Sequence, residues 1–511
     1  MAIRKLMAAA LIALGAPAQA APVEATATID TRAAGVRIAP EIYGQFAEQL
    51  GSGINGGIWV GEDSPIPNIR GYRTDVVEAL RKLRVPVVRW PGGCYGDIYH
   101  WRDGIGPRAS RPVTLNKWWG NTEEANQFGT HEFFEFAELI GTKTYLSVNV
   151  GSAEPAEASA WVEYVTYAGN STLAKERRAN GRDKPWKLDY VGIGNETWGC
   201  GGNMTAEEYD PIFRRFATFL HEKDGPKIIA SGANSADYHW TEVLMGKSRR
   251  QLDGISLHYY TLPTGVWSKK GAAIGFPESE WASTFMRTNK MEEMIREHGS
   301  RMDKEDPQKK IGLEVDEWGT WYDPTPGTNG AYLIQENTIR DALIASTNFN
   351  IFHRHADRVH MANIAQMVNV LQAMIQTDGP KMVLTPTYWA FLLYQPFQGA
   401  MALPIAVQTP DYVSGEIKLA AVDVTAARGT DGKLYVALTN VDPNQAAEVA
   451  LPGLARAAVS GQLLTGSRMD SRNSFADPSA VRPVAFGGAK WRDGKLVVSM
   501  PAKSLVVLTL G

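Results

Sequence analysis

The stretch from residue 188 to residue 222 indicates the fold, because it contains LDYVGIG (188–194), NETWG (195–199) and AEEYDPIFRRFATFLHE (206–222) in that order. The first segment is a short apolar run with β-branched residues, which is typical of a buried strand. The last segment has apolar residues spaced by three and four positions, as on one face of a helix. A buried strand that leads into an amphipathic helix is one βα unit of a parallel sheet.

The same alternation repeats along residues 37–398, where short apolar runs are separated by stretches of helical periodicity. Eight such units predict a (β/α)8 TIM barrel, an α/β fold whose strands close into a ring. A doubly wound open sheet has the same local pattern and remains the alternative on pattern alone. The other predicted strands are 41–46, 85–90, 143–150, 227–231, 252–260, 310–316 and 359–364, and further predicted helices are 74–83, 131–140 and 157–167.

The pattern of apolar residues changes after residue 398, where helical periodicity disappears. Short alternating runs such as 433–440 and 495–500 are separated by turn pairs such as Asp493-Gly494. This pattern predicts an antiparallel β-sandwich of jelly-roll-like architecture. We therefore expect four segments, namely a signal peptide (1–20), N-terminal strands that join the sandwich (21–36), the barrel (37–398) and the sandwich domain (399–511).

Residues 1–20 have the pattern of a secretory signal. Arg4 and Lys5 precede a short apolar run (6–14), and Ala18-Gln19-Ala20 is a small-x-small cleavage motif. The apolar run is much shorter than the roughly 20 residues that cross a membrane. We therefore expect a secreted or periplasmic protein with no membrane partner.

The composition is that of a large globular protein without an excess of positive charge. The 52 Lys and Arg residues are balanced by 55 Asp and Glu residues, which argues against a nucleic-acid partner. The 15 tryptophans supply rings that can stack on the flat apolar faces of sugars. Trp59, Trp118 and Trp119 lie in segments with adjacent Gly or Asn, and we expect them to line a cleft.

Two acidic side chains follow predicted strands at equivalent heights. Glu196 comes after the strand quoted above, and Glu317 ends the run LEVDE. Strict alternation places Glu317 on the same face as Leu313 and Val315. The carboxyl ends of the strands of a TIM barrel meet at one mouth, so we expect the two carboxylates to converge there.

His258 and Tyr260 share a face of the strand predicted at 252–260, and they would join the two carboxylates at the mouth. Glycosidic cleavage uses such a pair of carboxyl groups. One protonates the leaving oxygen, and the other attacks the anomeric carbon or activates water. The arrangement therefore predicts a glycoside hydrolase.

Seven short motifs together are highly specific in their order and spacing. They are IYGQFAE (42–48), RWPGG (89–93), YHWRDGIGP (99–107), GNE (194–196), HYY (258–260), DEW (316–318) and NIAQ (363–366). Because of these motifs, the sequence resembles glycoside hydrolase family 51, the α-L-arabinofuranosidases. The resemblance extends over most of the mature chain. The resemblance implies an exo-acting enzyme that releases terminal α-L-arabinofuranosyl groups from arabinan, arabinoxylan or derived oligosaccharides, without a metal or cofactor. It also implies homo-oligomers and a sandwich that is a structural partner of the barrel.

The family has its acid/base after the fourth barrel strand and its nucleophile after the seventh. The resemblance therefore implies that Glu196 is the general acid/base and Glu317 the nucleophile of a retaining enzyme, with carboxyl groups about 5–5.5 Å apart. Asn195 would hydrogen-bond the sugar 2-hydroxyl. Tyr260 would lie under the nucleophile, and His258 beside it.

Four further residues, Glu48, Cys94, Trp101 and Gln366, are expected by the same resemblance around the furanose. Many family members have Asn where this chain has Cys94, and a thiol lacks the paired donor and acceptor of an amide. The specificity of the Asn-bearing members is therefore not carried over. The second cysteine, Cys200, follows the Glu196 motif at a spacing that fits no zinc site. The sequence leaves a disulfide and two buried thiols as alternatives.

Two other functions remain open. A β-xylosidase or endoglucanase on the same scaffold would use the same carboxylates. The sequence does not separate these activities, because the loops determine whether the active site is a pocket or an open groove. A non-catalytic carbohydrate-binding protein belongs to a different class, and the presence of both Glu196 and Glu317 argues against it. The stretch GSGING (51–56) matches a dinucleotide-binding pattern, but no helix pattern follows it, so no nucleotide is expected.

Overall fold

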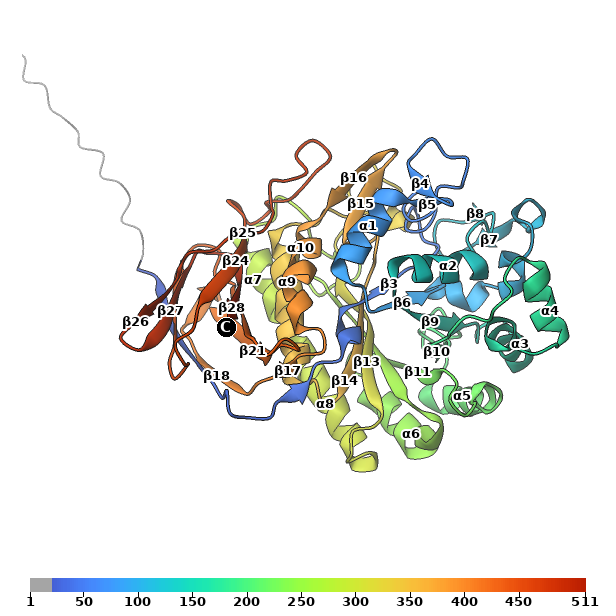
Figure 1. Ribbon diagram of the computed structural model, residues 1–511, viewed down its shortest axis with the longest axis horizontal. Coiled ribbons are helices and arrows are strands. Elements are labelled where there is room, and N and C mark those ends of the chain that lie inside the picture. The colour runs from blue at the N-terminus through green and yellow to red at the C-terminus, as the bar shows by residue number, and fades with distance from the viewer. Residues whose placement is uncertain (1–20) are drawn as a thin grey trace, which may run out of the picture.

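The computed structural model describes residues 21–511, so the predicted signal segment (1–20) lies outside the described residues. The protein consists of a closed parallel barrel surrounded by helices and a two-sheet β-sandwich packed beside it (Figure 1). The predicted TIM barrel with a C-terminal antiparallel sandwich is therefore confirmed. The open-sheet alternative is wrong, because the last barrel strand pairs with the first.

The barrel strands are buried almost completely, because helices cover the outside of the ring and side chains fill its inside. β10 (Tyr190–Ile193) is buried at every position, which explains its continuous apolar sequence. All eight strands predicted for the barrel are present. In ring order they are β3 (Gly44–Phe46), β6 (Val87–Trp90), β9 (Lys143–Val148), β10, β11 (Lys227–Asn234), β12 (Gly254–Thr261), β13 (Gly312–Thr320) and β14 (Val359–Ile364).

The helices begin and end at local sequence signals. α5 (Ala206–Leu220) begins at a capping box, in which the Thr205 hydroxyl accepts from the Glu208 amide and the Glu208 carboxylate accepts from the Thr205 amide. α9 (Ile339–Arg354) is buried along almost its whole length, because it lies between the barrel and the sandwich (Figure 1). The other helices are α1 (Thr74–Leu83), α2 (Thr130–Ile140), α3 (Pro155–Thr166), α4 (Thr172–Ala179), α6 (Tyr238–Ser248), α7 (Glu278–Thr288), α8 (Lys290–Glu305) and α10 (Pro386–Tyr394).

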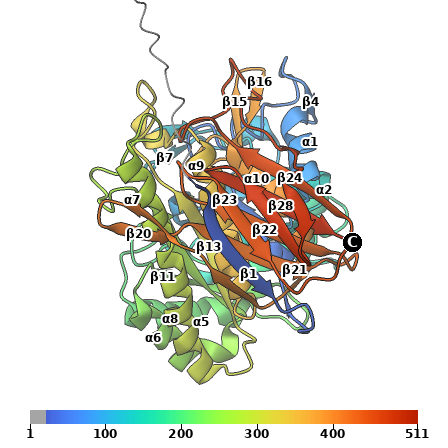
Figure 2. The same ribbon diagram turned by 90° about the vertical axis from the view of Figure 1, so that its left-hand side faces the viewer.

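The sandwich has one five-stranded and one seven-stranded sheet, whose strands face the viewer in Figure 2. The N-terminal segment contributes to both, because β1 (Val23–Ile29) pairs in the first sheet and β2 (Val36–Arg37) in the second. The first sheet has the order β18 (Ile405–Gln408), β1, β23 (Ala447–Leu451), β27 (Lys495–Met500) and β26 (Ala489–Arg492). The second has the order β2, β17 (Met401–Ala402), β21 (Val422–Arg428), β22 (Leu434–Asn440), β28 (Ser504–Leu510), β24 (Val459–Thr465) and β25 (Val484–Ala485).

Four antiparallel ribbons complete the described strands. Each consists of two short strands joined by a turn or loop. They are β4 (Asn68–Ile69) with β5 (Tyr72–Arg73), β7 (Thr114–Asn116) with β8 (Thr122–Glu124), β15 (Ile375–Asp378) with β16 (Lys381–Leu384), and β19 (Asp411–Ser414) with β20 (Ile417–Ala420).

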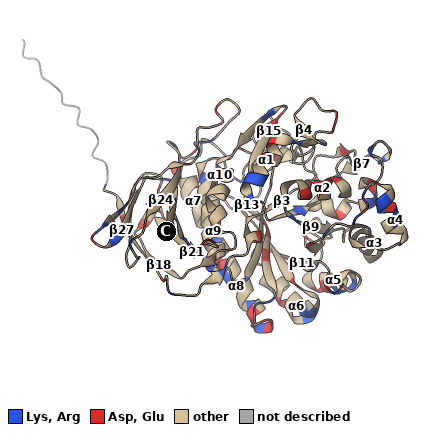
Figure 3. Ribbon diagram, in the orientation of Figure 1, with Lys and Arg blue, Asp and Glu red and all other residues tan. Residues whose placement is uncertain are grey.

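Charged residues of both signs are interspersed over the barrel helices (Figure 3). Some pair across neighbouring elements, as Arg182 does with Glu138 of α2. Within residues 21–511, no helix combines the length and the apolar character that crossing a membrane requires.

Candidate active site

Glu196 and Glu317 both lie at the carboxyl-terminal mouth of the barrel. Glu317 belongs to β13, and Glu196 follows the end of β10. Gly194 (φ 80°) and Glu196 (φ 42°) have left-handed backbone conformations, so the chain turns sharply where the strand ends. One oxygen of each carboxylate and a ring nitrogen of His258 all lie within 4.8 Å of one another. The structure thus brings together the two carboxylates that the sequence singles out.

An irregularity in β13 gives two adjacent acidic side chains access to the barrel interior. Within residues 314–318, β13 contains one residue more than the strand on either side. Asp316 accepts a hydrogen bond from the Tyr145 hydroxyl at 2.8 Å, and the next residue, Glu317, also points into the mouth. The alternation expected along this strand is therefore wrong across the bulge, because the extra residue breaks the two-residue period.

Arg89 is a site residue that sequence reasoning missed, although it begins the RWPGG motif. Its guanidinium is 1% exposed and donates to Glu317 Oε1 at 2.8 Å and to Asn195 Oδ1 at 2.5 Å. It also lies 3.4 Å from Asp316. Burial opposes ionisation of Asp316, but Arg89 and His258 outweigh it and lower the pKa of that carboxyl. Arg89 thus connects the nucleophile candidate with the amide beside the acid/base candidate.

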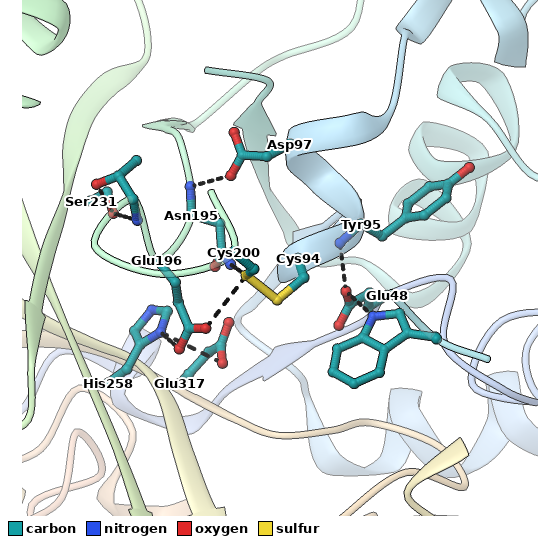
Figure 4. The surroundings of a disulfide bond; sticks show 12 residues. Glu48, Cys94, Tyr95, Asp97, Asn195, Glu196, Cys200, Ser231, His258 and Glu317 are labelled. Atoms are coloured by element: carbon teal, nitrogen blue, oxygen red, sulfur yellow. Dashed lines mark hydrogen bonds and ion pairs between the residues drawn. A yellow bond between two sulfur atoms is a disulfide. The ribbon is translucent and has the colours of Figure 1, made fainter. Parts of the chain in front are cut away.

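Glu196 is held by His258, whose ring also lies close to Glu317 (Figure 4). The His258 ring lies 2.9 Å from Glu196 Oε1 through Nδ1 and 3.1 Å from Asp316 Oδ1 through Nε2. Burial alone would lower the pKa of His258, but Glu317, Asp316 and Glu196 outweigh it and raise that pKa to about 10. Burial and then the charge of Glu317 raise the pKa of Glu196, although the hydrogen bond from His258 opposes them. The surroundings of the two glutamates therefore differ. Glu317 accepts a hydrogen bond from the Tyr260 hydroxyl at 2.7 Å, whereas the raised pKa of Glu196 favours its protonated form.

Glu48 forms the opposite wall of a small pocket between the carboxylates. Its Oε1 accepts from the Trp119 indole at 2.7 Å and from the Tyr95 amide at 2.9 Å, and Gln366 lies 3.3 Å from Oε2. Burial raises the pKa of Glu48 to about 7. The pocket is lined by Phe46, Glu48, Leu50, Gly93, Cys94, Trp119, Glu196, Tyr260, Glu317, Trp321, Leu333, Gln366 and Leu371.

A disulfide between Cys94 and Cys200 joins the segment after β6 to the segment after β10 (Figure 4). This pairing resolves the alternative that the sequence leaves open. Cys94 lines the pocket, and the sulfur of Cys200 lies 3.7 Å from Glu196 Oε2. The pocket wall at Cys94 is therefore a disulfide sulfur without an S–H donor.

Asp97 is the second residue that sequence reasoning missed. Its buried carboxylate accepts the amide hydrogens of Val150 (2.7 Å), Gly151 (2.9 Å) and Asn195 (2.9 Å). Burial raises its pKa to about 7 although these three donors oppose the change. The carboxylate fixes the backbone immediately before Glu196 and so determines where that side chain starts.

Not every aromatic residue expected at the site lies there. Trp101 does not line the pocket, because its ring is buried against α3, where it stacks on Trp161 and donates to the Glu157 carbonyl. Trp59 packs in the core, and its expected place in a cleft is wrong. Trp119 does line the pocket, whereas the pocket lining does not include the partly exposed Trp118.

Within residues 21–511, the groups of side chains close enough to hold a metal ion both belong to this site. One group is Cys94, Glu196 and Cys200, whose sulfurs form the disulfide and are not thiolate ligands. The other is Glu196, His258 and Glu317. A metal ion there would have to displace the hydrogen bond between His258 and Glu196.

Comparison with known proteins decides the family. Residues 79–273 match the family model described as Alpha-L-arabinofuranosidase 1 domain, and residues 316–504 match Alpha-L-arabinofuranosidase C-terminal domain. The crystal structure of the GH51 arabinofuranosidase from Xanthomonas axonopodis pv. citri superposes with a TM-score of 0.93 at 52% identity, covering 96% of this chain and 100% of that one. The chain belongs to glycoside hydrolase family 51. The predicted membership in this arabinofuranosidase family is confirmed, and the protein is a glycoside hydrolase.

Other relatives of this family 51 enzyme are similar to it over nearly its full length. A Bacteroides ovatus protein named Intracellular exo-alpha-L-arabinofuranosidase is 48% identical over 95% of this chain and 96% of its own length. Alpha-L-arabinofuranosidase C from Emericella nidulans is 32% identical, with 92% and 94% covered. The arabinose complex of the Thermotoga maritima α-L-arabinofuranosidase has a TM-score of 0.81 at 29% identity, with 95% and 99% covered.

The predicted localisation is contradicted by one of these relatives. The Bacteroides ovatus protein, which matches 95% of this chain, is named as intracellular. The expectation of a secreted or periplasmic protein with a signal peptide depended only on the sequence of residues 1–20, with its charged start, apolar run and small-x-small motif. That pattern is not specific to export, and we withdraw the prediction.

Proposed function

We propose that this family 51 enzyme is an exo-acting, retaining α-L-arabinofuranosidase. Its substrates would be terminal α-L-arabinofuranosyl groups of arabinan, arabinoxylan or derived oligosaccharides. The observation that carries the proposal is the approach of Glu196 and Glu317 within one small pocket, with carboxylate oxygens inside 4.8 Å. Retaining glycosidases need their two carboxyl groups about 5–5.5 Å apart, whereas inverting enzymes need a wider gap for water.

In the first step, Glu317 attacks the anomeric carbon while Glu196 donates its proton to the departing oxygen. The carbon–oxygen bond to the leaving sugar breaks as the ester bond to Glu317 forms. Arg89 and Tyr260 each donate to a different oxygen of Glu317, so the attacking carboxylate is fixed in orientation. In the second step, Glu196 removes a proton from water, and the water oxygen attacks the anomeric carbon. The bond from that carbon to Glu317 breaks, which releases arabinose and restores the Glu317 carboxylate.

The walls of the pocket suit one terminal furanose. Glu48 and Gln366 offer hydrogen-bonding groups at the far end, and the Cys94–Cys200 disulfide forms a side wall. Asn195, held by Arg89, would bind the 2-hydroxyl, and His258 would tune the charge of the carboxylates. Glu48 and Gln366 are buried, and a pocket that ends at them favours exo action, because an internal unit of a polymer needs an exit on both sides. Trp101 has no part in this binding proposal.

The test is release of 4-nitrophenol from the α-L-arabinofuranoside, with the β-D-xyloside and β-D-cellobioside assayed in parallel. We expect turnover of the arabinofuranoside, and arabinose as the sole early product from arabinan. Turnover of a pyranoside alone would favour the β-xylosidase or endoglucanase alternative. Early arabino-oligosaccharides would contradict exo action, and no turnover of any glycoside would favour a binding protein.

Replacement of Arg89 by lysine should lower kcat by at least about 100-fold with a smaller effect on KM. A single ammonium cannot contact Glu317 and Asn195 simultaneously with the geometry of the guanidinium. Steady-state kinetics on the aryl arabinofuranoside, with thermal unfolding to confirm folding, measures this effect. A folded variant with wild-type kcat would show that Arg89 does not position the nucleophile.

Replacement of His258 by asparagine should shift the alkaline side of the kcat/KM profile to higher pH. The imidazolium stabilises ionised Glu196 and so lowers its pKa, and its removal lets burial raise that pKa further. Since catalysis needs protonated Glu196, activity should persist to a higher pH than in the wild type. His239→Asn, on the exposed ion pair with Glu207, is the control that should leave the profile unchanged. An alkaline side that moves down in His258→Asn would contradict this role.

A further inference from the structure

A larger cleft adjoins the pocket and contains chemistry that the proposed cleavage does not use. Its volume is about 480 Å³, and it shares Glu196, Tyr260 and Trp321 with the pocket. Glu196 would protonate the leaving oxygen, so the departing part of the substrate must lie within its reach. The cleft is therefore where the leaving group is held, and its lining determines which leaving groups bind well.

The charges of this cleft are mostly positive. Arg287 and Lys290 line it together with His258, and Glu196 is the one carboxylate in the lining. In the part of the chain that the structure describes, neither Arg287 nor Lys290 forms an ion pair. Arg89, the buried arginine beside the two glutamates, behaves differently, since it pairs with two carboxylates. The cleft thus presents cations that have no protein counter-charge.

Arg287 is also fixed in place. Its Nε and Nη2 donate to the carbonyls of Pro263 (3.2 Å) and Thr264 (2.8 Å), which orients the guanidinium. Nη1 has no acceptor among residues 21–511. An oriented guanidinium with an available N–H group binds a carboxylate at a low entropic cost.

Two tryptophans add a surface for a sugar ring. Trp267 is 57% exposed and packs edge-to-face on Trp321, with ring centroids 5.2 Å apart. Lys270 lies 5.9 Å and 5.8 Å from the centres of these rings, and within residues 21–511 it likewise forms no ion pair. Exposed indole faces stack on the apolar faces of sugars. An additional cation at this platform again favours a ligand of opposite charge.

We propose that the cleft selects a leaving-group saccharide that bears a carboxylate, such as a uronic acid residue next to the arabinofuranosyl linkage. The proposal rests on the proposed arabinofuranosidase function and specifies its substrate class. The sugar ring would stack on the exposed Trp267 indole, which packs edge-to-face on Trp321, and the carboxylate would face Arg287 and Lys290. A neutral leaving group would bind without using these cations.

The test compares two disaccharides that differ only at C6 of the second sugar. In both, α-L-arabinofuranose is linked (1→3) to a methyl glycoside, either of glucuronic acid or of glucose, and released arabinose is measured. We expect wild-type kcat/KM to favour the uronide by about tenfold at low salt and by about twofold at high salt, because screening weakens the attraction. The ratio of the two kcat/KM values removes general effects of a substitution on catalysis.

Lys290→Gln and Lys270→Gln should each reduce this ratio by about threefold or more. Lys304→Gln, on the exposed end of the same helix as Lys290, should leave it unchanged. A wild-type ratio near one, or a preference that survives both the Lys290 and the Lys270 substitution, would overturn the proposal while leaving the arabinofuranosidase function intact. Failure to cleave either disaccharide and the aryl arabinofuranoside would instead contradict the proposed function, and the substrate class with it.

Discussion

Replacing Glu317 by alanine should reduce kcat/KM for 4-nitrophenyl α-L-arabinofuranoside by about 10⁴-fold or more. The covalent step needs a carboxylate oxygen at the anomeric carbon, and alanine provides none. The good leaving group does not compensate, because the lost step is the attack rather than the protonation. Kinetics on the purified variant, with circular dichroism to confirm folding, measures the effect.

Sodium azide supplies a second readout for this variant. A small anion that occupies the space left by the side chain can attack the anomeric carbon directly, so we expect slow formation of an arabinosyl azide with inverted configuration. The configuration can be assigned by NMR. An arabinosyl azide of retained configuration would indicate that another residue is the nucleophile.

Glu314→Gln is the matched control, since Glu314 lies in the same strand three residues earlier. Burial raises the pKa of Glu314 well above its usual range, which favours the protonated carboxyl group, and glutamine has the same shape as that group. We expect nearly full activity from this variant. An equal loss in both variants would mean that the effect of Glu317→Ala comes from disturbing β13 rather than from chemistry.

The sequence was sufficient to predict the barrel strands and the position of both glutamates, because these depend on local patterns. The apolar run before Gly194-Asn195-Glu196 predicts a buried strand, and residues directly after such strands meet at the mouth of a parallel barrel. Glu317 follows the predicted strand 310–316, but it belongs to β13 and points into the mouth across the bulge rather than by the expected alternation. Local pattern and global fold therefore agree fully at Glu196, whereas at Glu317 the sequence predicts the height along the strand and not the face.

The features that were missed depend on contacts between distant residues. Arg89 acts through Glu317, which is 228 positions away, and Asp97 through Asn195, 98 positions away. The bulge in β13 is defined by the register with its two neighbours rather than by its own residues. Trp101 belongs to a motif of the family, yet its ring packs on Trp161, in a helix much later in the chain. No single-segment pattern contains this information.

Replacing Glu196 by alanine should have an effect that depends on the leaving group. An arabino-oligosaccharide leaves as a poorly acidic alcohol, so loss of the proton donor should reduce kcat/KM by about 10³–10⁴-fold. The 4-nitrophenolate ion leaves without protonation, so its glycosylation step should be much less affected. For that substrate the slow step becomes hydrolysis of the glycosyl-enzyme, because the base is missing. We expect a burst of 4-nitrophenol followed by slow turnover, with a lowered KM.

The two roles of Glu196 result from its surroundings. Burial and the charge of Glu317 raise its pKa, which favours the protonated acid in the free enzyme. Once Glu317 is esterified its charge disappears, the pKa of Glu196 falls, and the same carboxyl group can act as the base. Azide should therefore accelerate turnover of the aryl substrate by Glu196→Ala and give the azide of retained configuration. Glu207→Ala, exposed in the first turn of α5, is the control that should behave as wild type. Equal losses on aryl and oligosaccharide substrates would show that Glu196 is not the proton donor.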